Sequence, residues 1–159
     1  MIKETTLKEI FKYKDGLLFW KQAGKGRSLN KPAGTMDKKG YIKVRFNNKQ
    51  YYVHRLVFLM HHGYLPKEID HIDGNKFNNK IENLRHATTS QNAMNRQKPR
   101  NNTSGYKGVS WDKKRNKWRT QIGFNGIQTT LGYYDCLVKA ATAYKIEAEK
   151  LHKEFANAN

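Results

Sequence analysis

The chain has 159 residues and carries 31 Lys and Arg against 13 Asp and Glu, a formal net charge of +18. A surface this basic fits a polyanionic partner, and nucleic acid is the commonest one. No apolar run is long enough to span a bilayer and no secretory signal pattern opens the chain, while the single Cys136 excludes an internal disulfide and a multi-cysteine zinc ribbon.

The first half of the chain alternates short periodic runs with turn signals. The predicted elements are, in order, an amphipathic helix at 5–13, a strand at 16–22, a basic loop at 23–40, strands at 41–46 and 49–54, and an apolar helix at 55–63. Asn47-Asn48 suits a tight turn with positive φ, so the two middle strands are expected to form a β-hairpin. The apolar helix is expected to end near Gly63.

The second half of the chain also alternates periodic runs with turn signals, and several of its runs are longer. The predicted elements are a strand at 68–72, a turn at 73–75, a strand at 84–88, a helix at 89–96, strands at 106–112, 117–125 and 127–134, and a helix at 135–156. Thr88 or Thr89 can cap the first of these helices, and Asp135 is expected to cap the second. The polar, basic stretch at 97–104, which contains Pro99, predicts a linker between two modules.

The C-terminal run separates apolar from basic side chains. One face is predicted to hold Trp118, Thr120, Ile122 and Phe124 of the middle strand and Ile127, Thr129, Leu131 and Tyr133 of the next. From Gly105 to Thr130 the chain has six Lys or Arg and one acid, Asp112. This one-sided charge favours a sheet that faces a polyanion over a merely solvated basic sheet.

The segment from Ser104 to Asn159 resembles the DNA-binding domain of the plant APETALA/ethylene-response-factor class, which also occurs in phage and bacterial endonucleases. The similarity lies in the Tyr-Lys-Gly-Val opening, the Trp118-Arg119 pair, the Leu131-Gly132 turn and the Ala-Ala-x-Ala-Tyr run at 140–144. In that family a three-stranded sheet lies in the DNA major groove. The resemblance implies that the DNA contacts are Lys107, Ser110, Trp111, Arg115, Lys117, Arg119, Gln121 and Thr130. The plant proteins carry more arginine on the first strand, so base preference does not transfer.

The stretch IDHIDGNKFNNKIENLRHATTSQN at 69–92 admits two interpretations, a polar loop that bonds its own backbone or a small metal site. Phosphodiester hydrolysis needs a base for water and positive charge at the phosphorus and at the departing 3′ oxygen. A histidine suits the first task, and a divalent ion held by oxygen ligands suits the second. Asp70 and His71 are adjacent, so on a strand they would point to opposite faces unless the strand ends there.

The segment from about Gly40 to Arg96 resembles the HNH (ββα-metal) nucleases, in particular phage homing endonucleases. The similarity covers HRLVF at 54–58, IDHIDGN at 69–75, NLR at 83–85 and QNAMN at 91–95. It implies that Asp70 and Asn92 ligate the metal, that His71 is the general base, and that Asn83 holds the loops. An oxygen-only site of this kind suits one Mg²⁺ or Mn²⁺ ion better than Zn²⁺. His54, Arg55 and Arg85 are candidate phosphate contacts, although packing or a surface salt bridge also fits them.

The sequence thus predicts an α+β protein of two modules. Residues 1–96 would form the N-terminal region and nuclease domain, with the HNH core at about 50–96, and residues 105–159 a three-stranded antiparallel sheet packed on one helix. The expected function is site-specific hydrolysis of double-stranded DNA inside a phage-infected or bacterial host, with a monomer slightly favoured. The alternatives are a DNA-binding regulator with an inactive HNH scaffold and an RNA-binding protein.

Overall fold

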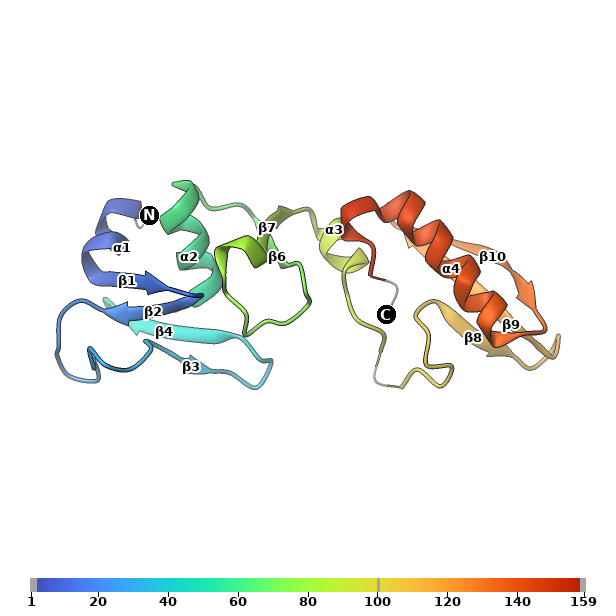
Figure 1. Cartoon of the computed structure of the whole chain (residues 1–159), viewed down its shortest axis with the longest axis horizontal. Helices are drawn as coiled ribbons and strands as arrows, with labels where there is room; N and C mark the ends of the chain where they lie inside the picture. Colours follow the sequence, from blue (N-terminus) through green and yellow to red (C-terminus); the bar gives the residue numbers. More distant parts are fainter. Residues whose placement is uncertain (1–2, 100, 158–159) are drawn as a thin grey trace. The chain divides into compact units, whose positions relative to one another are not determined.

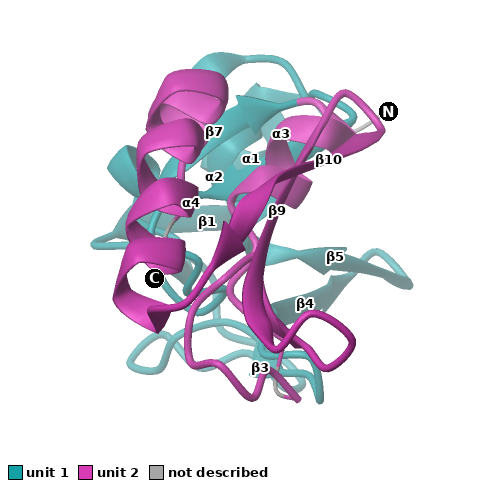
Figure 2. Ribbon diagram, turned by 90° about the vertical axis from the view of Figure 1, so that its right-hand side faces the viewer, with its two compact units in different colours: residues 1–87 teal, residues 88–159 magenta. Residues whose placement is uncertain are grey.

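The computed structural model describes residues 3–99 and 101–157 of the chain. The chain forms two compact units, Met1–Ala87 and Thr88–Asn159, shown in different colours in Figure 2. The described residues include small sheets and four α-helices, so the predicted mixture of α and β structure is confirmed. No helix in these described stretches has both the length and the apolar character needed to cross a bilayer.

The first unit begins with helix α1 (Glu4–Ile10), followed by a hairpin of β1 (Phe11–Lys14) and β2 (Leu17–Trp20) (Figure 1). The prediction of one helix over 5–13 is therefore wrong for its last residues. Phe11 is 1% exposed and its ring lies 4.6 Å from that of Trp20, so burial in the hairpin overrides the helical pattern. Asp15 and Gly16 form the turn, both with positive φ.

A three-stranded sheet follows, with the order β3 (Thr35–Met36), β4 (Ile42–Phe46) and β5 (Lys49–Tyr52). The strand β3 lies inside the stretch predicted to be only loop. The predicted β4–β5 hairpin is confirmed, and Asn47 and Asn48 have φ angles of 48° and 58°. Amide side chains tolerate this left-handed region better than most residues do, which is why this pair fits the turn.

Helix α2 (Val53–His62) contributes more residues to the first unit's core than any other element, and seven of its residues are buried. It ends as predicted at Gly63, whose φ is 72° and whose backbone N–H donates to the Leu59 carbonyl. The core that surrounds it draws on α1, on both hairpins and on the strand pair described next, and includes Leu7, Phe11, Leu18, Val44, Phe46, Val57, Phe58, Ile69 and Leu84.

A two-stranded antiparallel sheet of β6 (Glu68–His71) and β7 (Leu84–Ala87) closes the first unit. Its register sets Asp70 opposite Arg85 and His71 opposite Leu84. The strands are joined by a polar loop that ends in a short 3₁₀ turn at Ile81–Asn83. The strand expected at 68–72 ends at His71, one residue earlier than predicted.

The second unit begins with helix α3 (Thr89–Met94). Its cap is Thr88, whose hydroxyl accepts from the Gln91 backbone while the Gln91 side chain accepts from the Thr88 backbone. The antiparallel sheet that follows has the order β10 (Ile127–Tyr134), β9 (Lys117–Phe124) and β8 (Val109–Asp112). Helix α4 (Leu137–His152) shares a core with this sheet, made of Val109, Ile122, Ala140, Tyr144 and Ala148.

Two details of the second unit differ from the sequence-based prediction. The N-cap of α4 is Cys136, and Asp135 instead pairs with Lys117 at 3.2 Å between Nζ and Oδ1. The register of β10 shifts between Thr130 and Gly132, because a β-bulge inserts one extra residue there. Beyond the bulge the alternation is reversed, so Tyr134 packs on the core and Tyr133 is exposed.

Candidate active site

His71 lies at the end of β6 with only 5% of its surface exposed. Its Nε2 atom is 3.1 Å from the Oδ1 atom of Asn79, and its ring centroid is 5.1 Å from that of His54 and 6.1 Å from that of Tyr41. Burial lowers the pKa of His71, and the bond with Asn79 opposes part of this effect. The ring is therefore neutral near pH 7 and has a lone pair with which it can accept a proton.

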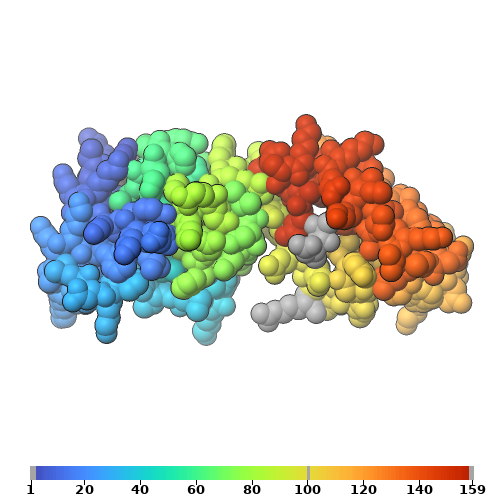
Figure 3. Space-filling model, viewed as in Figure 1, coloured from blue at the N-terminus to red at the C-terminus, as the bar shows by residue number. Residues whose placement is uncertain are grey.

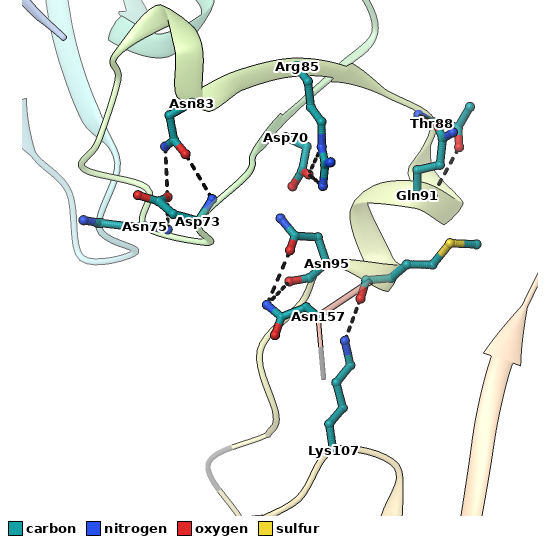
Figure 4. Close-up of polar contacts among 11 residues, drawn as sticks. Asp70, Asp73, Asn75, Asn83, Arg85, Thr88, Gln91, Asn95, Lys107 and Asn157 are labelled. Carbon is teal, nitrogen blue, oxygen red and sulfur yellow. Dashed lines mark hydrogen bonds and ion pairs between the residues drawn. The ribbon is translucent and has the colours of Figure 1, made fainter. Parts of the chain in front are cut away.

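Asp70 is 4% exposed and forms an ion pair with its cross-strand neighbour Arg85. The Nε and Nη2 atoms of the guanidinium each lie 2.8 Å from the carboxylate Oδ2 atom, as Figure 4 shows. Arg85, a candidate phosphate contact, is thus engaged by this carboxylate. A buried carboxylate needs such a partner, and the pair fixes the direction in which Asp70 points.

Asn83 braces the loop between β6 and β7. Its Nδ2 atom donates to the Asp73 carboxylate at 2.9 Å and its Oδ1 atom accepts from the Asp73 backbone at 3.0 Å (Figure 4). The Nδ2 atom also donates to the Asn78 carbonyl at 2.8 Å. The Ile72 backbone N–H also donates to the Asn83 carbonyl. These bonds hold the residues that directly follow His71.

Asn79 is the site residue that reasoning from the sequence missed, because it looked like an ordinary loop amide. It is 1% exposed, and its side chain, rather than that of Asn83, forms the hydrogen bond to His71. The available signal was weak: Asn79 is the second of two adjacent asparagines ahead of the Asn83-Leu84-Arg85 run. Only the folded loop shows which of the two amides turns inward.

The remaining candidate phosphate contacts in the first unit are His54 and Arg55. Burial, with smaller effects from His71 and Arg55, lowers the pKa of His54 to about 3. Its Nδ1 atom is buried and has no hydrogen-bond partner among the described residues. Arg55 donates to the carbonyls of Pro66 and Lys67 at 3.0 and 3.2 Å, so it ties α2 to the segment that leads into β6.

Asn92, the second expected metal ligand, lies on α3 in the second unit. Its role as a ligand therefore belongs to the proposal below and not to the observed geometry. Helix α3 is anchored within its own unit at its C-terminal end. The Lys107 Nζ atom donates to the Met94 carbonyl at 2.6 Å, and the Asn157 Nδ2 atom donates to the Asn95 carbonyl at 2.9 Å (Figure 4).

The sheet of the second unit places most of its predicted DNA contacts on one face. Cross-strand pairs join Ser110 to Arg119 and Gln121 to Thr130. Core residues occupy the alternating positions of β9, so these four side chains and that of Lys117 share the face opposite the core. Arg115 lies in the β8–β9 turn, where it bonds Asp112 and stacks 4.5 Å from the Tyr133 ring.

Two of the predicted DNA contacts lie elsewhere. Trp111 pairs with Trp118 on the core side of the sheet, with ring centroids 5.0 Å apart, although 42% of its surface is exposed. Lys107 points to the end of α3, and burial lowers its pKa to about 8. Trp111 is kept from the open face of the sheet by the strand register, and Lys107 by its buried amine, which bonds the Met94 carbonyl.

The donor chemistry of the proposed ligands fits a hard divalent ion. Asp70 offers carboxylate oxygen, and an asparagine such as Asn92 offers amide oxygen, which are the ligand types that Mg²⁺ accepts. Within the described residues, no three His, Cys, Asp or Glu side chains group together as a metal cluster. A set of one carboxylate and one amide does not need such a cluster, since Mg²⁺ is commonly held by few protein ligands.

Comparisons with known proteins show which family the chain resembles. Residues 51–94 match the HNH endonuclease family, a segment that contains β6, β7 and α3. Protein 3.8 of Escherichia phage T7 is 40% identical over 119 residues, covering 71% of this chain and 98% of that protein. An uncharacterized HNH endonuclease of Acanthamoeba polyphaga mimivirus is 34% identical over 127 residues, covering 78% of this chain and 65% of that protein.

No solved structure matches the chain significantly. The matched segment includes strand β6, which carries the buried Asp70 and His71. HNH nucleases generally use a divalent metal ion and act on DNA. The chain belongs to the same family as Protein 3.8 of phage T7 and carries an HNH endonuclease domain at residues 51–94.

Proposed function

We propose that the protein is a site-specific DNA endonuclease of the phage homing type, which hydrolyses phosphodiester bonds with one divalent ion per site. The observation that carries the proposal is the buried His71 next to Asp70 at the end of β6, inside the matched segment. Asp70 and Asn92 hold Mg²⁺ or Mn²⁺, His71 is the general base, and Asn83 braces the loop that follows His71.

His71 begins the reaction by taking a proton from the attacking water. The water oxygen forms a bond to phosphorus, and the bond from phosphorus to the 3′ oxygen breaks. The departing 3′ oxygen takes a proton from a solvent water, and His71 returns its proton to solvent, so the products are a 5′-phosphate and a 3′-hydroxyl. The ion, when bound, supplies positive charge for the phosphate and for the departing oxygen. Arg85 holds the Asp70 carboxylate in one orientation, so the side chain of Asp70 is already fixed in place before the ion binds.

The C-terminal module, residues 105–159 after a linker at 97–104, supplies the DNA-binding surface, with the nuclease module at 1–96. Support comes from the open face of the β8–β10 sheet, which carries Ser110, Lys117, Arg119, Gln121 and Thr130. A pleated strand pair of this kind fits the major groove, where base edges are distinguishable. Arg115, at the edge of this face, adds a backbone contact.

The test is incubation of the full chain with supercoiled plasmid and phage DNA in Mg²⁺, with and without a chelator, beside Asp70→Asn. We expect metal-dependent cleavage by the wild type and loss of cleavage with retained DNA binding in the variant. Wild-type protein that binds DNA and leaves it intact would instead support a regulator with an inactive scaffold. Binding to RNA alone would overturn the assignment of the sheet to DNA.

A further inference from the structure

The side-chain amide of Asn79 has one hydrogen-bond partner in the described part of the chain, and that partner is His71, the proposed base. Its Oδ1 atom lies 3.1 Å from His71 Nε2, while its Nδ2 atom is buried without a partner among the described residues. Burying an amide costs free energy unless the amide is hydrogen-bonded. The side chain therefore does little for the loop itself, and its one bond acts on His71.

A carbonyl oxygen only accepts hydrogen bonds, so the bond to Asn79 requires a proton on His71 Nε2. A neutral imidazole carries one N–H, and its basic lone pair is then on Nδ1. We propose that Asn79 is a positioning residue, which fixes this tautomer and ring orientation of His71. The inference rests on the proposed function, because it concerns the base of that reaction.

The N-terminal hairpin holds the Asn79 segment from the outside. The Tyr13 hydroxyl accepts a bond of 3.0 Å from the Ile81 backbone N–H. A Cβ atom on Gly16 would lie 2.7 Å from the Lys80 nitrogen and 2.9 Å from the Asn79 carbonyl carbon, so the hairpin turn touches the loop backbone. Figure 3 shows the blue atoms of the hairpin against the yellow-green atoms of this loop.

Neither Tyr13 nor Gly16 lies within the segment that matches the HNH family. The β1–β2 hairpin thus extends the site beyond the matched residues, because it fixes the backbone from which Asn79 reaches His71. Within the loop, the Asn79 backbone N–H donates to the Phe77 carbonyl at 3.1 Å. The backbone around Asn79 is therefore held by a bond inside the loop and by its contacts with the hairpin.

The experiment measures the His71 tautomer by nitrogen NMR of the full chain at roughly pH 8, where the ring is neutral, without metal or DNA. We expect an N–H at Nε2 in the wild type and in Asn79→Asp, which keeps the acceptor. Asn79→Leu, of similar size, removes the acceptor and should give a mixture of tautomers. Asn75→Leu, in the exposed part of the same loop, is the matched control and should behave as the wild type.

Cleavage kinetics provide the second measurement. Asn79→Leu should lower kcat roughly 10- to 100-fold with little change in KM, and Asn79→Asp should recover most of the loss. Tyr13→Phe should lower kcat roughly 2- to 10-fold, whereas Tyr64→Phe, on an exposed tyrosine of the same unit, should not.

A wild-type proton on Nδ1, or an unchanged tautomer in folded Asn79→Leu, would overturn the proposal. If Asn79→Leu does not fold, Asn79→Asp and Tyr13→Phe decide, and equal activity of Tyr13→Phe and Tyr64→Phe would overturn the part assigned to the hairpin. A wild type that shows the expected tautomer and never cuts DNA would refute the proposed function and leave the Asn79 contact standing.

Discussion

The two buried histidines of the first unit, His54 and His71, lie in one aromatic cluster and have different surroundings. His71 has a hydrogen bond to Asn79, whereas the Nδ1 atom of His54 has no partner among the described residues. The rings of Tyr41 and Tyr52 lie 5.4 and 5.5 Å from that of His54. Close rings leave little room for a phosphate, so this environment favours packing as the role of His54.

The depressed pKa of His54 predicts that the first unit is sensitive to acid. Its pKa falls from 6.5 to about 3 on folding, so between these values the unfolded chain binds more protons and stability rises with pH. The stability that depends on neutral His54 is fully present above about pH 6.5 and is lost as pH falls toward 3, a change on the order of 5 kcal/mol. Urea unfolding across this range should show a flatter pH dependence in His54→Phe than in the wild type.

The exposed His86, on β7, is the control for this measurement. His86→Phe should retain the wild-type pH dependence, because its side chain is exposed in the folded protein. A parallel pH dependence in His54→Phe and the wild type would show that the buried ring of His54 is not what makes folding acid-sensitive.

For single residues, the sequence predicted which residue types suit the reaction better than it predicted which side chains contact one another. Asp70 and His71 could be selected as residue types that suit metal binding and proton transfer, and the structure shows both buried on one strand. The bond from Asn79 to His71 could not be predicted. It depends on how the loop folds against Tyr13 and Gly16, which precede it by more than sixty residues.

Among the elements, α3 shows how short segments depend on their surroundings. It has six residues, and isolated helices of this length are marginal in water. The capping box of Thr88 and Gln91 satisfies its first backbone groups, and Lys107 and Asn157 bind carbonyls at and beyond its last turn. The cap was predictable from local sequence, whereas the two distant donors were not.

The anchoring role of Lys107 predicts a difference between two basic residues of the second unit. Lys107→Met should leave the salt dependence of DNA binding unchanged, because its amine is turned to the Met94 carbonyl. Arg119→Gln, on the open face of the sheet, should lower the slope of log Kd against log salt by about 0.9 if it contacts one phosphate. Fluorescence anisotropy titrations at several salt concentrations measure both slopes. A drop for Lys107→Met equal to that for Arg119→Gln would contradict the anchoring role.

Gly108 is predicted to be irreplaceable in the second unit. Its φ is +72°, and a Cβ atom there would lie 2.2 Å from two ring carbons of Tyr144 and 2.6 Å from the Gln121 carbonyl oxygen. Gly108→Ala should therefore lower the free energy of unfolding by roughly 3 kcal/mol or more. Gly126→Ala, at φ +79° with open space around the new atom, should cost only about 1–2 kcal/mol. Denaturant unfolding compares the two, and equal losses would contradict the clash.

The accuracy of the predicted elements follows the range of the interactions that determine them. The β4–β5 hairpin and the end of α2 are confirmed, because Asn47-Asn48 and Gly63 fix their own backbone. Strand β1 was predicted wrongly because burial of Phe11 against Trp20 decides its conformation. The bulge in β10 follows from pairing with β9 and has no clear local signal.

For the whole molecule, a net charge of +18 spread over two compact units agrees with binding to a long polyanion. The HNH match covers residues 51–94, and the basic open face of the β8–β10 sheet lies outside it. The proposed function places catalysis and DNA binding in different parts of the chain. We therefore expect that removal of the base stops cleavage without removing DNA affinity.

The most direct test is the single-turnover rate constant of Mg²⁺-dependent DNA cleavage by His71→Ala, with His86→Ala on the neighbouring strand as control. We predict that His71→Ala cuts roughly 10²- to 10⁴-fold more slowly than the wild type, because it lacks the base, while its DNA affinity changes little. His86→Ala should cut at the wild-type rate. Cleavage by His71→Ala as fast as that by the wild type would contradict the central claim that His71 is the general base.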